Sequence, residues 1–167
     1  SRINVSSGTL QSTTLTTGAV GTAGTITGTW SLSGASQLEA TYSADLAEYY
    51  EGDKDYEVGT VLVFGGDKEV TTTTDMNDTR VAGVVSNTAA YSMYAACPGF
   101  KNLIALQGRV PVKVVGRVRK GDMLTTSATP GYAVKATDPK LGSIIGKALE
   151  DKDYGEAGTI QVAVGRM

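Results

Sequence analysis

The chain has 167 residues, of which 41% are hydrophobic, which is enough for one buried core with an extension beside it. Its net charge is −2 at pH 7, and Lys and Arg do not cluster beyond the short run 117–120, so we expect no nucleic-acid partner. No apolar run approaches the roughly 20 residues that span a bilayer, and we therefore expect no membrane insertion.

The sequence offers few residues for catalysis. It contains one cysteine, Cys97, and no histidine. A lone cysteine cannot form an intrachain disulfide, and it lacks the imidazole that usually activates a thiol nucleophile. Zinc and copper sites lose their commonest ligand, and the acidic run 151–156 is closer to a solvated turn than to a calcium loop. We therefore expect no metal site, no cofactor and no conventional enzyme.

Residues 1–38 differ sharply from the rest of the chain. They carry a single charge, Arg2, and consist mainly of Ser, Thr and Gly. Aliphatic side chains nevertheless recur every five residues, beginning at Val5. This period fits neither a helix nor a strand, but it suits short extended rungs joined by tight turns.

One copy of this tract has too few aliphatic side chains to bury a core, whereas several copies around a common axis would each supply one side chain per layer. We therefore predict an extended, Thr/Gly-rich β stalk of the β-helix type, intertwined in a homotrimer. A flexible linker with accidental spacing is the alternative. The expected interface residues are Val5, Leu10, Leu15, Val20, Ile26, Trp30 and Leu32.

Residues 39–56 are expected to form a junction. The stretch 44–50 is the only one with a helical pattern, because Asp45 suits an N-cap and Glu48 follows three residues later, as in a capping box. We predict a helix of one or two turns that ends before Gly52. Nearby tyrosines suit packing at a domain or subunit junction.

Residues 57–167 alternate between short β-prone runs and turn signals. Gly-rich turns make hairpins of 58–64 with 69–74 and of 121–127 with 131–136. Pro111 has no backbone donor, which places its strand at an edge or a bulge. We predict an all-β barrel or sandwich with almost no helix. The other expected strands are 79–86, 102–108, 109–116, 142–150 and 158–165.

The β-rich part also contains an internal repeat. Residues 57–62 resemble 119–124, and residues 81–85 resemble 144–148. Two separate motifs thus agree on an offset of about 62 residues. We predict two copies of a strand–hairpin–strand unit, in which the repeated glycines mark bulges or close backbone crossings.

Several segments resemble a domain at the C-terminal end of phage tail-fibre and neck-appendage proteins. They are ATYSADLAEYYEGDKDYEVGTVLVFGGDKEV, DTRVAGVVS, KVVGRVRKGDMLTTSATPGYA and IIGKALED. That group includes the peptidase G2-type intramolecular-chaperone domains, which begin with a similar Ala-Asp-x-Ala-Glu element. The resemblance covers roughly residues 40–165 and is most specific in ADLAEYYEGD and VGTVLVFGGDKEV.

Some members of that family assemble a trimeric β-helical shaft and then release the chaperone by self-cleavage before the Asp of this element. The resemblance implies a scissile bond between Ala44 and Asp45, with Asp45 and Glu48 as assisting carboxylates and Ser43 nearby. A strained peptide bond can be cut by its own neighbours, because proximity replaces substrate binding. In the alternative interpretation Asp45 and Glu48 only cap a helix, and no residue is catalytic.

Three functions follow from these patterns. The first is a structural module of a phage fibre or appendage, assembled in the host cytoplasm, retained in the virion, and in contact with itself and other virion proteins. The second is an intramolecular chaperone that trimerises the preceding shaft and cuts itself. The third is a tip that binds a host-surface glycan or receptor through Tyr91 and Tyr94.

Overall fold

The computed structural model describes residues 39–40 and 43–165, so the predicted stalk and its interface residues lie outside the described residues. The chain divides into two units, 1–38 and 39–167, of which the second is described here. Its fold is all-β, as predicted, with no helix in the described part and hence no helical membrane span there. The ten strands are β1 (Asp45–Gly52), β2 (Val61–Phe64), β3 (Val70–Thr71), β4 (Val81–Val85), β5 (Tyr91–Met93), β6 (Phe100–Val114), β7 (Met123–Thr126), β8 (Ala133–Lys135), β9 (Ile144–Ala148) and β10 (Gly158–Gly165).

Five strands close a barrel in the C-terminal half. β6 pairs with β10, β10 with β9, β9 with β7, β7 with β8, and β8 pairs with β6 again. Every pair is antiparallel except the last, which is a short parallel contact between Val114 and Ala133. Closure leaves these strands without a long exposed edge.

The N-terminal strands follow the same scheme. The pairing runs in the corresponding order through β1, β3, β2, β4 and the first half of β6, and a short parallel contact between β1 and β3 closes the ring. We call this N-terminal ring of paired strands the first circuit and the C-terminal barrel the second circuit. Leu62 of β2 pairs with Gly83 of β4, next to a β-bulge, and Leu124 of β7 pairs with Gly146 of β9, next to another. The positions of the sequence motifs are therefore equivalent in the two circuits.

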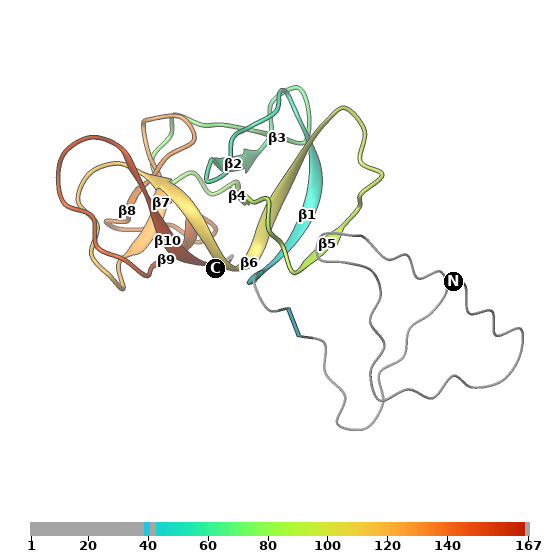
Figure 1. Cartoon of the computed structure of the whole chain (residues 1–167). Coiled ribbons are helices and arrows are strands. Elements are labelled where there is room, and N and C mark those ends of the chain that lie inside the picture. The colour runs from blue at the N-terminus through green and yellow to red at the C-terminus, as the bar shows by residue number, and fades with distance from the viewer. Residues whose placement is uncertain (1–38, 41–42, 166–167) are drawn as a thin grey trace, which may run out of the picture. The chain divides into compact units, whose positions relative to one another are not determined.

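β6 belongs to both circuits, and Figure 1 shows it running between the two groups of strands. The predicted break into two strands at Gly108 is wrong, because Gly108 pairs with Asp45 of β1 and with Val164 of β10 inside one continuous strand. Gly108 has a φ of +120°, and an added Cβ would overlap the Ala44 carbonyl oxygen. This glycine permits a close crossing of backbones rather than a turn.

Pro111 lies in β6 at a position where no neighbouring strand would accept a hydrogen bond from a backbone N–H. Its register partner is Gln161 of β10. The N–H of Lys113, two residues later, donates away from β10 to the Gly59 carbonyl, at 2.9 Å. Because backbone groups alternate along a strand, the Pro111 nitrogen faces away from β10, as the Lys113 nitrogen does. On that side of β6, Pro111 lies between the residues that pair with β4 and the residue that pairs with β8. The local edge predicted for Pro111 agrees with this arrangement.

Strand β4 joins the two circuits, since all five of its residues are buried. Ala82 and Val85 belong to the apolar cluster inside the N-terminal circuit, together with Leu62 and Ile104. Neighbouring Val84 belongs to the larger cluster of the C-terminal barrel. Burial on both faces explains why β4 is a continuous apolar run instead of an alternating one.

The helical turn predicted over residues 44–50 is wrong, because all of this segment except its first residue lies in strand β1. All eight residues of β1 have register partners in β6, whereas an isolated helix of one or two turns would gain few hydrogen bonds for its ordering cost. Tyr49 and Tyr50 also favour a strand. The ring of Tyr50 packs edge-on against Phe64, with 5.4 Å between ring centroids. Asp45 therefore caps no helix.

Candidate functional site

The peptide bond between Ala44 and Asp45 lies at the entrance to β1. Ala44 is exposed, but the Asp45 side chain is buried, with only 3% of the residue accessible. Neither Asp45 carboxylate oxygen has a hydrogen-bond partner of normal geometry among the described residues. The Ser86 hydroxyl and the backbone N–H of Asp45 itself lie close enough to favour the charged form. The site thus contains a buried carboxyl group whose bonding capacity is largely unused.

Burial dominates the electrostatics of Asp45. Removal from water disfavours the carboxylate and raises the pKa of Asp45 above its usual value, and the nearby Ser86 hydroxyl offsets only part of this rise. The neutral acid is consequently favoured in the folded protein over a wider pH range than in an exposed aspartate. A protonated carboxyl group can donate a proton, which a typical surface aspartate at neutral pH cannot.

The backbone around the same bond is held from two sides. The N–H of Arg109 donates to the Ala44 carbonyl oxygen at 3.0 Å, and the N–H of Ala90 donates to the Asp45 carbonyl oxygen at 2.8 Å. Gly108 allows this approach, since an added Cβ would lie 2.6 Å from the Asp45 Cα. A donor on the Ala44 carbonyl polarises its carbon and stabilises negative charge on its oxygen.

The structure does not assemble all of the residues that the sequence suggested for cleavage. The extra residue of the bulge opposite β1 lies in β6, so side chains alternate regularly along β1. Asp45 and Glu48 therefore point to opposite faces. Glu48 instead accepts a hydrogen bond from the Tyr50 hydroxyl at 2.7 Å. Ser43 is half-buried next to the bond.

Sequence reasoning missed the two residues of β6 that contact this bond. Gly108 was interpreted only as a separator between strands, and Arg109 was assigned no role. The dipeptide Gly108-Arg109 in the middle of an apolar run was the available signal. Its meaning depends on the register between β1 and β6, which places Gly108 opposite Asp45, a residue far away in the sequence.

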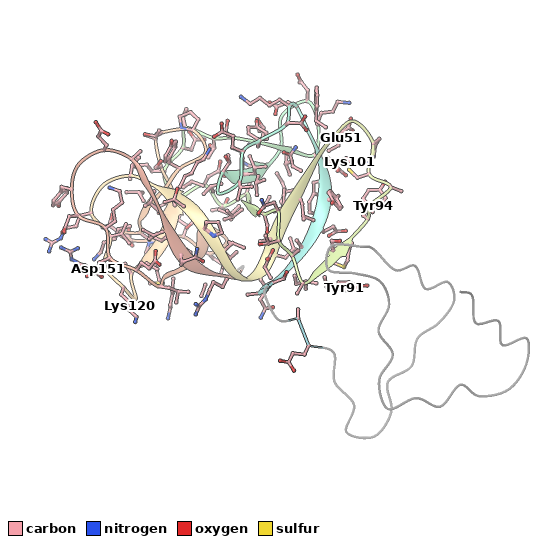
Figure 2. All side chains as sticks on the ribbon, in the orientation of Figure 1. Glu51, Tyr91, Tyr94, Lys101, Lys120 and Asp151 are labelled. Carbon is pink, nitrogen blue, oxygen red and sulfur yellow. The ribbon has the colours of Figure 1, made fainter. Side chains whose placement is uncertain are left out.

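The two tyrosines suggested for surface binding lie on one flank of the domain. Tyr91 opens β5 and is 57% exposed, and Tyr94, just after β5, is 54% exposed. Figure 2 shows both along the outer side of β1, with Lys101 and Glu51 farther along the same flank. Lys101 donates to the Ala95 carbonyl at 3.1 Å. Binding by these tyrosines stays a prediction.

The described residues show no cluster of three or more potential metal ligands among His, Cys, Asp and Glu. The single thiol, Cys97, is buried, and this burial raises its pKa above the usual value. A raised pKa keeps the thiol protonated and therefore weakly nucleophilic. The Ala44–Asp45 bond, by contrast, has a backbone N–H that donates to its carbonyl oxygen, and beside it lies a carboxyl group without a hydrogen-bond partner of normal geometry among the described residues.

The sequence matches no protein-family model and no curated protein. Solved structures are similar in fold. The C-terminal fragment of bacteriophage phi29 gene product 12 aligns with a TM-score of 0.53 and 15% identity, covering 72% of this chain and 99% of that one. Pre-mature phi29 gene product 12 aligns with a TM-score of 0.55 and 14% identity, covering 76% of this chain and 22% of that one.

The base of the phi29 head fibre gp8.5 aligns with a TM-score of 0.40 and 18% identity. The chain thus spans nearly the whole gene product 12 fragment but only about a fifth of its pre-mature form. Identities near 15% relate folds and leave the activity of this chain to be argued from its own residues. The described β-barrel domain shares its fold with the C-terminal fragment of bacteriophage phi29 gene product 12.

Proposed function

We propose that the chain is a structural component of a phage fibre or appendage and acts as a homotrimer in the virion. The observation that carries this proposal is the fold shared with the C-terminal fragment of phi29 gene product 12, which this chain covers to 99%. The five-residue aliphatic period before the barrel supports it, since such a tract gains a core only between copies. Contact with other virion proteins belongs to the same proposal.

The full-length chain is expected to have a native mass three times that of the 17.3 kDa monomer. Replacing Leu10 and Leu15 together by Asn should shift the mass toward the monomer, because two apolar layers of the stalk would be lost. Native mass spectrometry and sedimentation both measure this. The matched control replaces Thr13 and Thr14 by Asn and should remain trimeric. A monomeric unmodified chain would contradict the proposal.

A second candidate function is that of an intramolecular chaperone that cuts its own Ala44–Asp45 bond after the shaft has assembled. The specific observation in its favour is the buried Asp45 carboxyl next to a carbonyl that the Arg109 N–H polarises. Water would add to the Ala44 carbonyl carbon, and the resulting oxyanion would be stabilised by the Arg109 N–H. The carboxyl of Asp45 would then protonate the departing amide nitrogen, the C–N bond would break, and the resulting Asp45 carboxylate would accept the proton that the added water loses.

Purified full-length chain is expected to convert with time into fragments 1–44 and 45–167, and Asp45→Ala should abolish this conversion. Denaturing gels and intact-mass measurement follow the products. The side-chain oxygens of Asp45 accept no hydrogen bond of normal geometry among the described residues, so removing the side chain leaves no donor unpaired, and circular dichroism checks the fold. Asp67→Ala, on an exposed turn, is the control and should cleave normally. A chain that stays intact through long incubation would exclude self-cleavage and leave the structural proposal untouched.

A further inference from the structure

Strand β5 has no counterpart in the second circuit. β4 and β6 are joined by residues 86–99, which include β5, whereas the corresponding β9 and β10 are joined by the shorter segment 149–157 without a strand. β5 pairs in parallel with the N-terminal half of β1 and contributes no residue to either apolar cluster. β5 therefore adds nothing to either apolar core.

The flank around β5 is unusually apolar for a surface. Of the eight large hydrophobic side chains exposed in the described residues, four lie on β1, on β5, just after β5 or at the first residue of β6. Leu46 and Tyr91 are register partners, so their side chains are neighbours on one face. Exposed apolar patches of this kind mark interaction surfaces. The four residues are Leu46, Tyr91, Tyr94 and Phe100.

The outer edge of β5 is also unpaired. Within the described residues its only strand partner is β1, which leaves the opposite row of backbone groups available. The segment after β5 is nonetheless ordered: Cys97 is buried and its N–H donates to the Tyr94 carbonyl at 3.0 Å. Tyr94 itself has a φ of +56°. An ordered edge with apolar side chains is suited to contact with another protein chain.

We propose that the β5 flank, defined as Leu46, residues 91–94 and Phe100, is the contact between barrel domains of neighbouring copies of this chain. This inference rests on the proposed homotrimer. The chain enters the barrel at Asp45, directly before Leu46, and β5 pairs with the three residues that follow this entry point. A stalk that holds three copies together also holds the three starts of β1 close, which raises the effective concentration of the β5 flanks for one another.

The test uses cysteine labelling of full-length protein. Ser92→Cys places a thiol in β5, and Thr159→Cys places one at an exposed position of β10, as a matched control in the second circuit. In the assembled trimer, maleimide should label Ser92→Cys at least ten times more slowly than Thr159→Cys. In denaturant the two rates should be equal. The unmodified chain gives the background from Cys97, which is 1% exposed.

A second pair of variants follows assembly directly. Tyr91→Glu with Tyr94→Glu should raise the concentration at which trimers dissociate at least tenfold, because three copies would each bury two charges. Tyr154→Glu, at a tyrosine that is 79% exposed in the second circuit, should leave it unchanged. A monomeric unmodified chain would overturn the trimer and this interface together.

Two outcomes would overturn the interface alone. The first is a trimer in which Ser92→Cys reacts as fast as Thr159→Cys. The second is a trimer in which Ser92→Cys reacts rapidly and becomes protected only when a host-envelope polysaccharide is added, since the flank would then be a glycan site.

Discussion

Replacing Gly146 by Ala is expected to lower the free energy of unfolding by about 3 kcal/mol, near the upper end for overpacking a tight site. An added Cβ would overlap the Ala163 carbonyl oxygen of β10 and lie 2.8 Å from the Val164 Cα. Both atoms belong to backbone inside a paired strand, so they cannot turn aside as a flexible side chain can. The melting temperature should fall by an amount on the order of 10 °C, measured by circular dichroism or calorimetry.

Gly165→Ala provides the control, because its added Cβ meets no atom of the described residues within 4 Å. It should change the melting temperature by very little. Gly83→Ala, at the equivalent position of the first circuit, should destabilise at least as much as Gly146→Ala. Its Cβ would overlap the Ala105 carbonyl oxygen, and its φ of +149° adds backbone strain for any residue with a side chain. Equal stability of Gly146→Ala and Gly165→Ala would contradict the close crossing of β9 and β10.

The sequence permitted prediction of much of the β architecture. Both hairpins follow from Gly-rich turns between β-prone runs, and the structure confirms β2 with β3 and β7 with β8. The glycines of the two motifs at 81–85 and 144–148 were expected at bulges or close crossings, and Gly83 and Gly146 lie next to bulges. Such features are local, because glycine and alternating apolar residues constrain the backbone wherever they occur.

The errors fall where long-range pairing decides the structure. The segment 44–50 has a plausible capping box, but pairing with β6 outweighs that weak local preference. β5 was not predicted, since three residues without a clear period become a strand only by pairing with β1. The division at Gly108 failed for the same reason, because the residue that requires a glycine there is Ala44, just before the distant strand β1.

The candidate site was predictable only in part. The resemblance to the phage appendage domains located the Ala44–Asp45 bond, but it also grouped Glu48 with Asp45, and the alternation of β1 separates them. The contribution of Arg109 comes from its backbone N–H, which any residue except proline would supply at that position. A backbone donor cannot be recognised from the type of residue, so only the register of β6 against β1 reveals it.

The second large effect is expected for Asp78→Asn, which should lower the free energy of unfolding by about 2 kcal/mol at pH 7. The Asp78 side chain is 4% exposed and accepts hydrogen bonds from Arg80 through its backbone N–H at 2.9 Å, its Nε at 3.0 Å and its Nη2 at 2.6 Å. Arg80 is the main reason that the pKa of Asp78 is lowered to about 2. A shift of nearly two pKa units corresponds to roughly this free energy, since one unit is worth about 1.4 kcal/mol.

The lowered pKa of Asp78 determines how its contribution to stability changes with pH. A carboxyl whose pKa is lower in the folded state than in the unfolded chain stabilises the protein fully above its ordinary pKa, near 3.8, and loses this contribution as the pH falls toward 2. The difference between Asp78→Asn and the unmodified chain should therefore be largest at neutral pH and shrink steadily below pH 4. Urea denaturation at a series of pH values measures it.

Asp75→Asn is the matched control for this experiment. Asp75 also faces Arg80, but the distance from Arg80 Nη2 to its Oδ2 is 3.8 Å and its side chain is 72% exposed. An exposed ion pair is screened by water and contributes little, so this variant should change stability by less than about 1 kcal/mol. Asp78 also connects the two circuits, because its N–H donates to the Thr126 Oγ1 of β7 at 2.9 Å. If both variants were equally stable at neutral pH, the ion pair between buried Asp78 and Arg80 would not hold the β3–β4 connection against the second barrel.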